Sequence, residues 1–142
     1  MGEQLNITVN LINQKVQFKG KARNNPEVVF DYNPPLGDGQ GYTGLEMLLM
    51  SLSACSGTAI VTLLRRMNKN ISAFEVQANG IRQEQLPMAF ENITLEFIIT
   101  SDNTENNDVQ KVIRMAEESY CPVWAMLRNN VEITTSYRIA GE

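Results

Sequence analysis

The segment from Thr43 to Arg66 reads TGLEMLLMSLSACSGTAIVTLLRR. Its first four residues match the capping-box pattern, in which the Thr43 hydroxyl and the Glu46 carboxylate bond to backbone N–H groups of the first helical turn. Met47 to Leu64 then follow without a charge, and two arginines close the segment, where cations suit the end of a helix. We predict one long helix that begins here and runs to about Asn68.

This uncharged stretch is long enough to raise the question of a membrane span. Gly57 near its middle and five hydroxyl side chains, Ser51, Ser53, Ser56, Thr58 and Thr62, argue against one. The strand patterns on either side are also expected to share one sheet, which a span would separate. We therefore predict no membrane and a helix buried nearly all round at the centre of a soluble domain. Because a chain of 142 residues does not easily cover such a helix, a dimer is expected.

The flanking sequence alternates in the manner of strands. Before the helix, residues 5–11, 16–19 and 28–32 alternate apolar and polar side chains, which predicts a three-stranded antiparallel meander. After it, strands are predicted at 74–78, 93–99 and 132–139, a helix at 109–120 and a helix break at Cys121-Pro122. The predicted class is α+β, a mostly antiparallel sheet around a long buried central helix, in a single domain over residues 1–142.

Composition excludes several kinds of chemistry. The chain has no histidine, which excludes histidine bases and Cys-His or Ser-His-Asp nucleophiles, and its two cysteines are too few for a four-thiolate zinc site. The net charge is −4, and no basic run is present, so no nucleic-acid partner is expected. The first residues show no signal-peptide pattern, which predicts a cytoplasmic protein with reduced thiols.

A glycine pattern precedes the helix. Residues 39–44, GQGYTG, fit the dinucleotide fingerprint G-x-G-x-x-G. That fingerprint requires a strand directly before it and an acidic residue about 20 positions later. Two prolines separate it here from the preceding strand, and Leu64 stands at the later position. We predict a surface loop, no cofactor and no metal.

From the residues alone, two interpretations of the cysteines stay open. A free cysteine is commonly a small, inert member of the core. Cys55, however, lies among small residues that allow a ligand to approach, and Cys121 lies at the predicted helix break, where free N–H groups favour a thiolate. Glu46 lies nine residues before Cys55, about 13 Å along the helix axis, which favours its capping role. Arg23 lies in a polar stretch between two predicted strands.

The two cysteine segments resemble those of a known family. Residues 44–55, GLEMLLMSLSAC, resemble the first-cysteine helix of the OsmC/Ohr family, the osmotically inducible and organic hydroperoxide resistance proteins. Residues 116–123, AEESYCPV, resemble its second-cysteine segment, and the strand-rich start and glycine-rich loop are also similar. The chain is most similar to the OsmC-like branch.

The resemblance implies an intertwined homodimer with active sites at the subunit interface. It implies a stress-response peroxidase for organic hydroperoxides, with Cys55 as the peroxidatic thiolate and Cys121 as the resolving thiol. A dithiol reductant, such as a lipoylated protein, would restore the pair. The family's glutamate falls in the turn of Glu46, although the better-characterised branch has it at the position of Leu45, and Arg23 is the candidate for its arginine. Trp124 stands where smaller residues are common and could fill the pocket.

Three hypotheses follow from these observations. The first is a cysteine-based peroxidase that acts on organic hydroperoxides. The second is a redox-sensitive or small-ligand-binding homodimer without significant peroxidase turnover, favoured by the displaced glutamate. The third is a structural domain with inert cysteines.

Overall fold

The structure of the protein is a computed structural model that describes residues 2–141. The chain separates into two compact units, of which the first ends at Leu48 and the second begins at Leu49. Helix α1 (Gly44–Arg66) crosses this boundary. The single domain over 1–142 stays a prediction.

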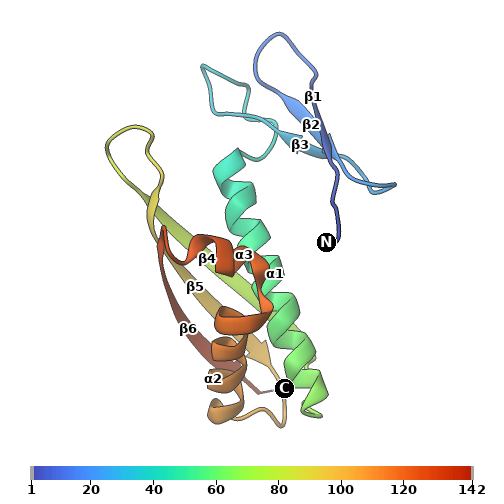
Figure 1. The fold of residues 1–142 in the computed structure, drawn as a ribbon, viewed down its shortest axis with the longest axis vertical. Helices are drawn as coiled ribbons and strands as arrows, with labels where there is room; N and C mark the ends of the chain where they lie inside the picture. The colour runs from blue at the N-terminus through green and yellow to red at the C-terminus, as the bar shows by residue number, and fades with distance from the viewer. Residues whose placement is uncertain (1, 142) are drawn as a thin grey trace. The chain divides into compact units, whose positions relative to one another are not determined.

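The first unit contains the predicted antiparallel meander. Strands β1 (Thr8–Leu11), β2 (Phe18–Lys21) and β3 (Val28–Phe30) pair in the order β1-β2-β3 (Figure 1). Both pairs are antiparallel, which confirms the prediction from the alternating residues.

The loop after β3 is organised by one buried carboxylate. Asp31 accepts hydrogen bonds from the backbone N–H groups of Tyr32, Asp38 and Gln40 at 2.8, 3.3 and 3.0 Å. The bond from Gln40 is the main cause that lowers the pKa of Asp31 below its ordinary value. Gly37 passes so close to Tyr32 and Asp31 that a Cβ atom there would collide with both. The predicted surface loop is thus a fixed turn around Asp31.

The predicted capping box opens α1. The Thr43 N–H donates to Glu46 Oε1 at 2.8 Å, and the Glu46 N–H donates to Thr43 Oγ1 at 3.2 Å. The helix ends at Arg66, and Asn68 takes a left-handed conformation with φ of 63°, which commonly terminates a helix. The predicted start and end of the helix are therefore confirmed.

The second unit holds a separate sheet. Strands β4 (Ala73–Arg82), β5 (Phe90–Thr100) and β6 (Glu132–Ala140) pair in that order. The β4–β5 pair is antiparallel, but β6 runs parallel to β5 because the chain returns through intervening helices. The expectation of one sheet on both sides of α1 was wrong, because the strands of residues 2–141 form two three-stranded sheets.

Helices cover one side of this second sheet, where the core lies. In the second unit, α1, α2 (Asn106–Met115) and α3 (Pro122–Leu127) lie on the same side of the strands (Figure 1). Gly57 brings α1 against β4, because a Cβ atom there would lie 3.2 Å from the Phe74 ring. Alternate residues of β5 face the helices and are fully buried: Ile93, Leu95, Phe97 and Ile99.

Within the described residues, α1 is the one helix whose length and apolar composition would suffice to cross a membrane. This is weak evidence for a span, because a core helix of a soluble protein meets the same criteria. Its buried side includes Leu52, Ile60 and Leu64, all without exposed surface. The opposite side stays exposed in the single chain along the stripe Met50, Ser51, Ala54, Thr58 and Thr62. The helix is therefore buried on one side in a single chain rather than all round.

Candidate active site

The two cysteines are neighbours in the folded second unit. Cys55 lies in α1 and is half-buried, whereas Cys121 precedes α3 and is only 3% exposed. Both are free thiols, and the Cys55 side chain lies close enough to Cys121 to raise the pKa of the Cys121 thiol. The structure therefore brings together the two residues that the sequence singled out.

A π-helical turn places Cys121. Residues Ala116–Tyr120 form η1, a π-helix that continues α2, and the Cys121 N–H donates to the Ala116 carbonyl at 2.9 Å. This bond spans five residues instead of the four of an α-helix, so the turn holds one extra residue. Such turns occur frequently at functional sites. The helix predicted over 109–120 is therefore continuous, but its last turn is wider.

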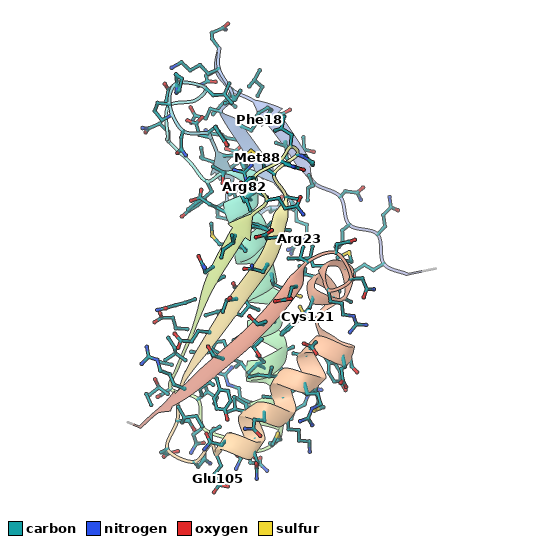
Figure 2. All side chains as sticks on the ribbon, turned by 90° about the vertical axis from the view of Figure 1, so that its left-hand side faces the viewer. Phe18, Arg23, Arg82, Met88, Glu105 and Cys121 are labelled. Carbon is teal, nitrogen blue, oxygen red and sulfur yellow. The ribbon has the colours of Figure 1, made fainter. Side chains whose placement is uncertain are left out.

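The predicted break at Cys121-Pro122 is confirmed. Cys121, which is labelled in Figure 2, lies directly before α3. Its φ is −103° and its ψ is 104°, and Pro122 is the first residue of α3. The Cys121 sulfur accepts the Trp124 N–H at 3.4 Å, so the thiol caps this short helix. Proline has no N–H, which costs nothing at the first helical position.

The two thiols have different surroundings. Burial raises the pKa of Cys121 to about 11, and the contact with Cys55 acts in the same direction, whereas the Trp124 N–H opposes it. Cys121 is therefore a protonated thiol at neutral pH. Cys55 is the more accessible of the pair.

Cys55 opens onto a cavity of about 390 Å³. The other residues of its lining come from α1, from the end of η1 and from the start of α3: Thr58, Ala59, Thr62, Leu63, Arg66, Tyr120 and Pro122. Cys121 does not line this cavity. A small molecule in the cavity thus meets the Cys55 thiol, with Cys121 buried beside it.

Two of the other predicted site residues, Glu46 and Arg23, belong to the first unit. The Glu46 carboxylate is engaged with Thr43 in the capping box, so its structural role is confirmed. Arg23 lies exposed in the turn between β2 and β3, with a positive φ of 57°. Trp124 is 1% exposed and is not part of the cavity lining. The catalytic roles of Arg23 and Glu46 stay predictions.

The sequence analysis missed two residues of the cavity. Arg66 was assigned only to the helix end, and Tyr120 only to a helical face. The spacing contained a signal for Arg66, because residues 55, 59, 62 and 66 follow one another by three or four and share one side of a helix.

The glycine pattern lies in a loop rather than in the junction that a dinucleotide fingerprint requires. Residues 39–41 belong to the Asp31 loop and not to a strand-turn-helix junction. Within residues 2–141, His, Cys, Asp and Glu side chains form no group of three that could hold a metal ion.

Comparison with known proteins identifies relatives of this chain and solved structures with a similar fold. Protein YhfA of Escherichia coli K12 is 30% identical over 124 residues, which cover 87% of this chain and 90% of YhfA. An OsmC-like protein from Mycoplasma pneumoniae superimposes with a TM-score of 0.84 at 19% identity, covering 99% of each chain. The organic hydroperoxide resistance protein OhrB of Bacillus subtilis gives 0.65 at 16% identity, covering 96% of this chain and 98% of OhrB.

The sequence profile of one family also matches this chain. Its description is OsmC-like protein, and the match extends over residues 37–136, which include both cysteines. The chain belongs to the OsmC-like family.

Proposed function

We propose that this protein is a thiol peroxidase that reduces organic hydroperoxides through a Cys55 sulfenic acid and a Cys55–Cys121 disulfide. The observation that carries the proposal is the pairing of a cavity-lining thiol with a buried, protonated thiol. Family membership supports the same chemistry, because a relative of this fold is named for organic hydroperoxide resistance.

The proposed reaction has three steps. The Cys55 thiolate attacks the outer oxygen of the hydroperoxide ROOH, the O–O bond breaks, and the alkoxide takes up a proton and leaves as the alcohol ROH. Cys121 then attacks the sulfenic acid, a disulfide forms, and the sulfenic hydroxyl leaves as water with the Cys121 proton. A dithiol reductant, such as a lipoylated protein, returns two electrons and two protons to the pair.

The surroundings of the thiols support this division of roles. A nucleophilic cysteine needs access to substrate and the ability to ionise. Cys55 lines the cavity, whereas Cys121 is buried with a pKa raised to about 11. Cys121 therefore suits the second step, in which it needs to reach only Cys55.

The proposal includes a cytoplasmic homodimer. Leu5, Ile7, Val9 and Leu11 form one apolar row on and before β1, and they are 81, 67, 46 and 55% exposed. The exposed residues Met50, Ser51 and Ala54 in the first half of α1 are also uncharged. Apolar rows of this kind commonly mark an interface, so we infer that a second copy of the chain covers them.

The test is the intact mass and free-thiol count of the reduced protein after one equivalent of an alkyl hydroperoxide. We expect a loss of two hydrogens and of both thiols in the native protein. Cys121→Ser should accumulate a trappable sulfenic acid, and Cys55→Ser should not. Two free thiols after several minutes would contradict the proposal.

The second candidate is a redox-sensitive or ligand-binding homodimer without significant turnover. It is favoured by the Glu46 carboxylate, which is engaged with the backbone of its own helix end. This candidate predicts a single oxidation of the pair without sustained consumption of peroxide when a dithiol is supplied. Sustained consumption would exclude it.

A further inference from the structure

The cavity beside Cys55 has chemically different ends. Cys55 and Arg66 both line it, and both lie on the same side of α1. Eleven residues separate them, which corresponds to about 16 Å between their Cα atoms along the helix axis. Helical side chains lean toward the helix N-terminus, which is the direction of Cys55 as seen from Arg66.

The rest of the cavity lining is largely apolar. Ala59, Leu63 and Pro122 contribute aliphatic surface, and Tyr120 contributes an aromatic ring. Thr58 and Thr62 add methyl groups and hydroxyls. The cavity lining therefore combines a thiol, apolar side chains and a guanidinium group.

Arg66 has no partner of its own within residues 2–141. It makes no ion pair or side-chain hydrogen bond there, although four other basic residues, Lys15, Lys19, Lys69 and Arg138, lie close to carboxylates. Arg65 and Arg66 both complement the dipole at the end of α1. Of these two arginines, Arg66 lines the cavity and Arg65 does not. The helix dipole therefore does not explain why an arginine lines the cavity.

We propose that Arg66 binds the carboxylate of an amphiphilic hydroperoxide whose peroxide group reaches Cys55. The guanidinium group can form two parallel hydrogen bonds with a carboxylate, and the apolar lining would hold the aliphatic chain between the two ends. This inference rests on the proposed peroxidase function and assigns Arg66 as its specificity-determining residue.

The experiment compares two substrates that differ only at the carboxyl end, which is negatively charged in one and a neutral methyl ester in the other. They are decanoic acid with a terminal hydroperoxide group and the methyl ester of the same molecule. We expect the native protein to show a kcat/KM for the acid that exceeds that for the ester by about tenfold, the size of one charge-assisted hydrogen bond. In Arg66→Gln this acid-to-ester ratio should fall to about one. Arg66→Lys should retain part of the ratio, because lysine keeps the positive charge but lacks the planar guanidinium group that forms two parallel hydrogen bonds with a carboxylate.

Arg65→Gln is the matched control. It removes the same charge from the same helical turn, but Arg65 does not line the cavity, so the acid-to-ester ratio should stay at its native value. An unchanged ratio in Arg66→Gln, or an equal loss in both variants, would overturn the assignment of Arg66.

A second measurement separates this inference from the peroxidase proposal. Maleimidohexanoic acid and its methyl ester alkylate thiols without peroxide chemistry, and in Cys121→Ser the remaining thiol is Cys55. We expect faster labelling by the acid than by the ester, and loss of this preference when Arg66→Gln is added. One outcome separates the two proposals: neither hydroperoxide is consumed, but the acid still labels Cys55 faster than the ester and this preference depends on Arg66. In that case the peroxidase proposal fails, and the assignment of Arg66 as the carboxylate-binding residue stands. Equal rates of Cys55 labelling by the acid and the ester would overturn the assignment of Arg66 as the carboxylate-binding residue.

Discussion

The stability of the protein depends on whether the Cys121 thiol is ionised. Burial raises the pKa of this thiol to about 11 from an ordinary value of 9.0, at which the thiol of an unfolded chain ionises. The native state thus holds the proton more tightly than the unfolded state. The protonated Cys121 thiol therefore makes its full contribution to the free energy of unfolding below about pH 9. This contribution is lost as the pH rises from about 9 toward 11.

We therefore expect the urea midpoint of the reduced protein to fall between pH 9 and 11 more steeply than that of Cys121→Ser. Urea unfolding followed through Trp124, the single tryptophan, measures this directly. Cys55→Ser serves as the control, because it keeps the buried Cys121 thiol. Parallel curves for the native protein and Cys121→Ser would contradict the burial argument.

Glu46 permits a test that separates charge from capping. Glutamine can also complete a capping box, so Glu46→Gln retains the hydrogen bond to Thr43 and removes the negative charge. Glu46→Ala removes both, at a cost of about 1 kcal/mol in the free energy of unfolding. If Glu46 assists the peroxidatic thiol, both variants should slow peroxide consumption per folded molecule.

A native rate in Glu46→Gln would restrict Glu46 to the capping role that the structure shows.

Arg23 can be tested in the same assay. Arg23→Gln should be slower than Arg23→Lys if the positive charge is what the reaction needs.

At the scale of elements, η1 fixes the direction in which Cys121 points. Its extra residue is visible in the bond from the Cys121 N–H to the Ala116 carbonyl. Deletion of Glu118, which is exposed, would restore the α-helical repeat and rotate the following residue by about 100° relative to the preceding turns. We expect this variant to retain its helix content and to lose Cys55–Cys121 disulfide formation, measured by circular dichroism and by intact mass after oxidation.

Alanine substitution of Glu118 is the control, because it changes the side chain and keeps the residue count. This variant should form the disulfide at the native rate. Rapid disulfide formation in the deletion variant would show that the π-helical turn is not needed to bring the thiols together.

The sequence predicted most elements and the antiparallel meander, but not the division into two sheets or the pairing of the last strand. Alternation located the strands, and Thr43 and Glu46 located the start of α1, because these signals are local. The parallel pairing of β6 with β5 and the π-helical turn at Ala116–Tyr120 depend on packing between distant segments, so local patterns did not reveal them. Asp31 also escaped prediction, because its role depends on where the backbone of residues 38–40 returns.

The distinction between local signals and contacts of distant segments also applies to the candidate site. Cys55 and Cys121 were singled out from the sequence, and their contact in the structure agrees with that choice. Arg66 and Tyr120 were missed, because a cavity lining combines residues from α1 and η1 that are more than fifty positions apart.

At the scale of the whole molecule, the apolar row before and along β1 provides the test of the dimer. Ile7 belongs to this row and is 67% exposed in the single chain, whereas Thr8 points to the opposite face of the strand. If a second copy covers the row, Ile7→Glu would bury an unpaired charge, which is costly. We expect this change to raise the dissociation constant of the dimer about 100-fold, whereas Thr8→Glu should leave it near the native value.

Sedimentation equilibrium over a range of protein concentrations measures both constants. A native protein that stays at the monomer mass of 16.0 kDa at every concentration would contradict the dimer. If the active sites lie at the subunit interface, as the family resemblance implies, dissociation should also lower the activity. We therefore expect the rate of peroxide consumption per chain to fall in Ile7→Glu in proportion to its dimer fraction and to recover at higher concentration. A concentration-independent rate in that variant would show that each chain carries a complete site.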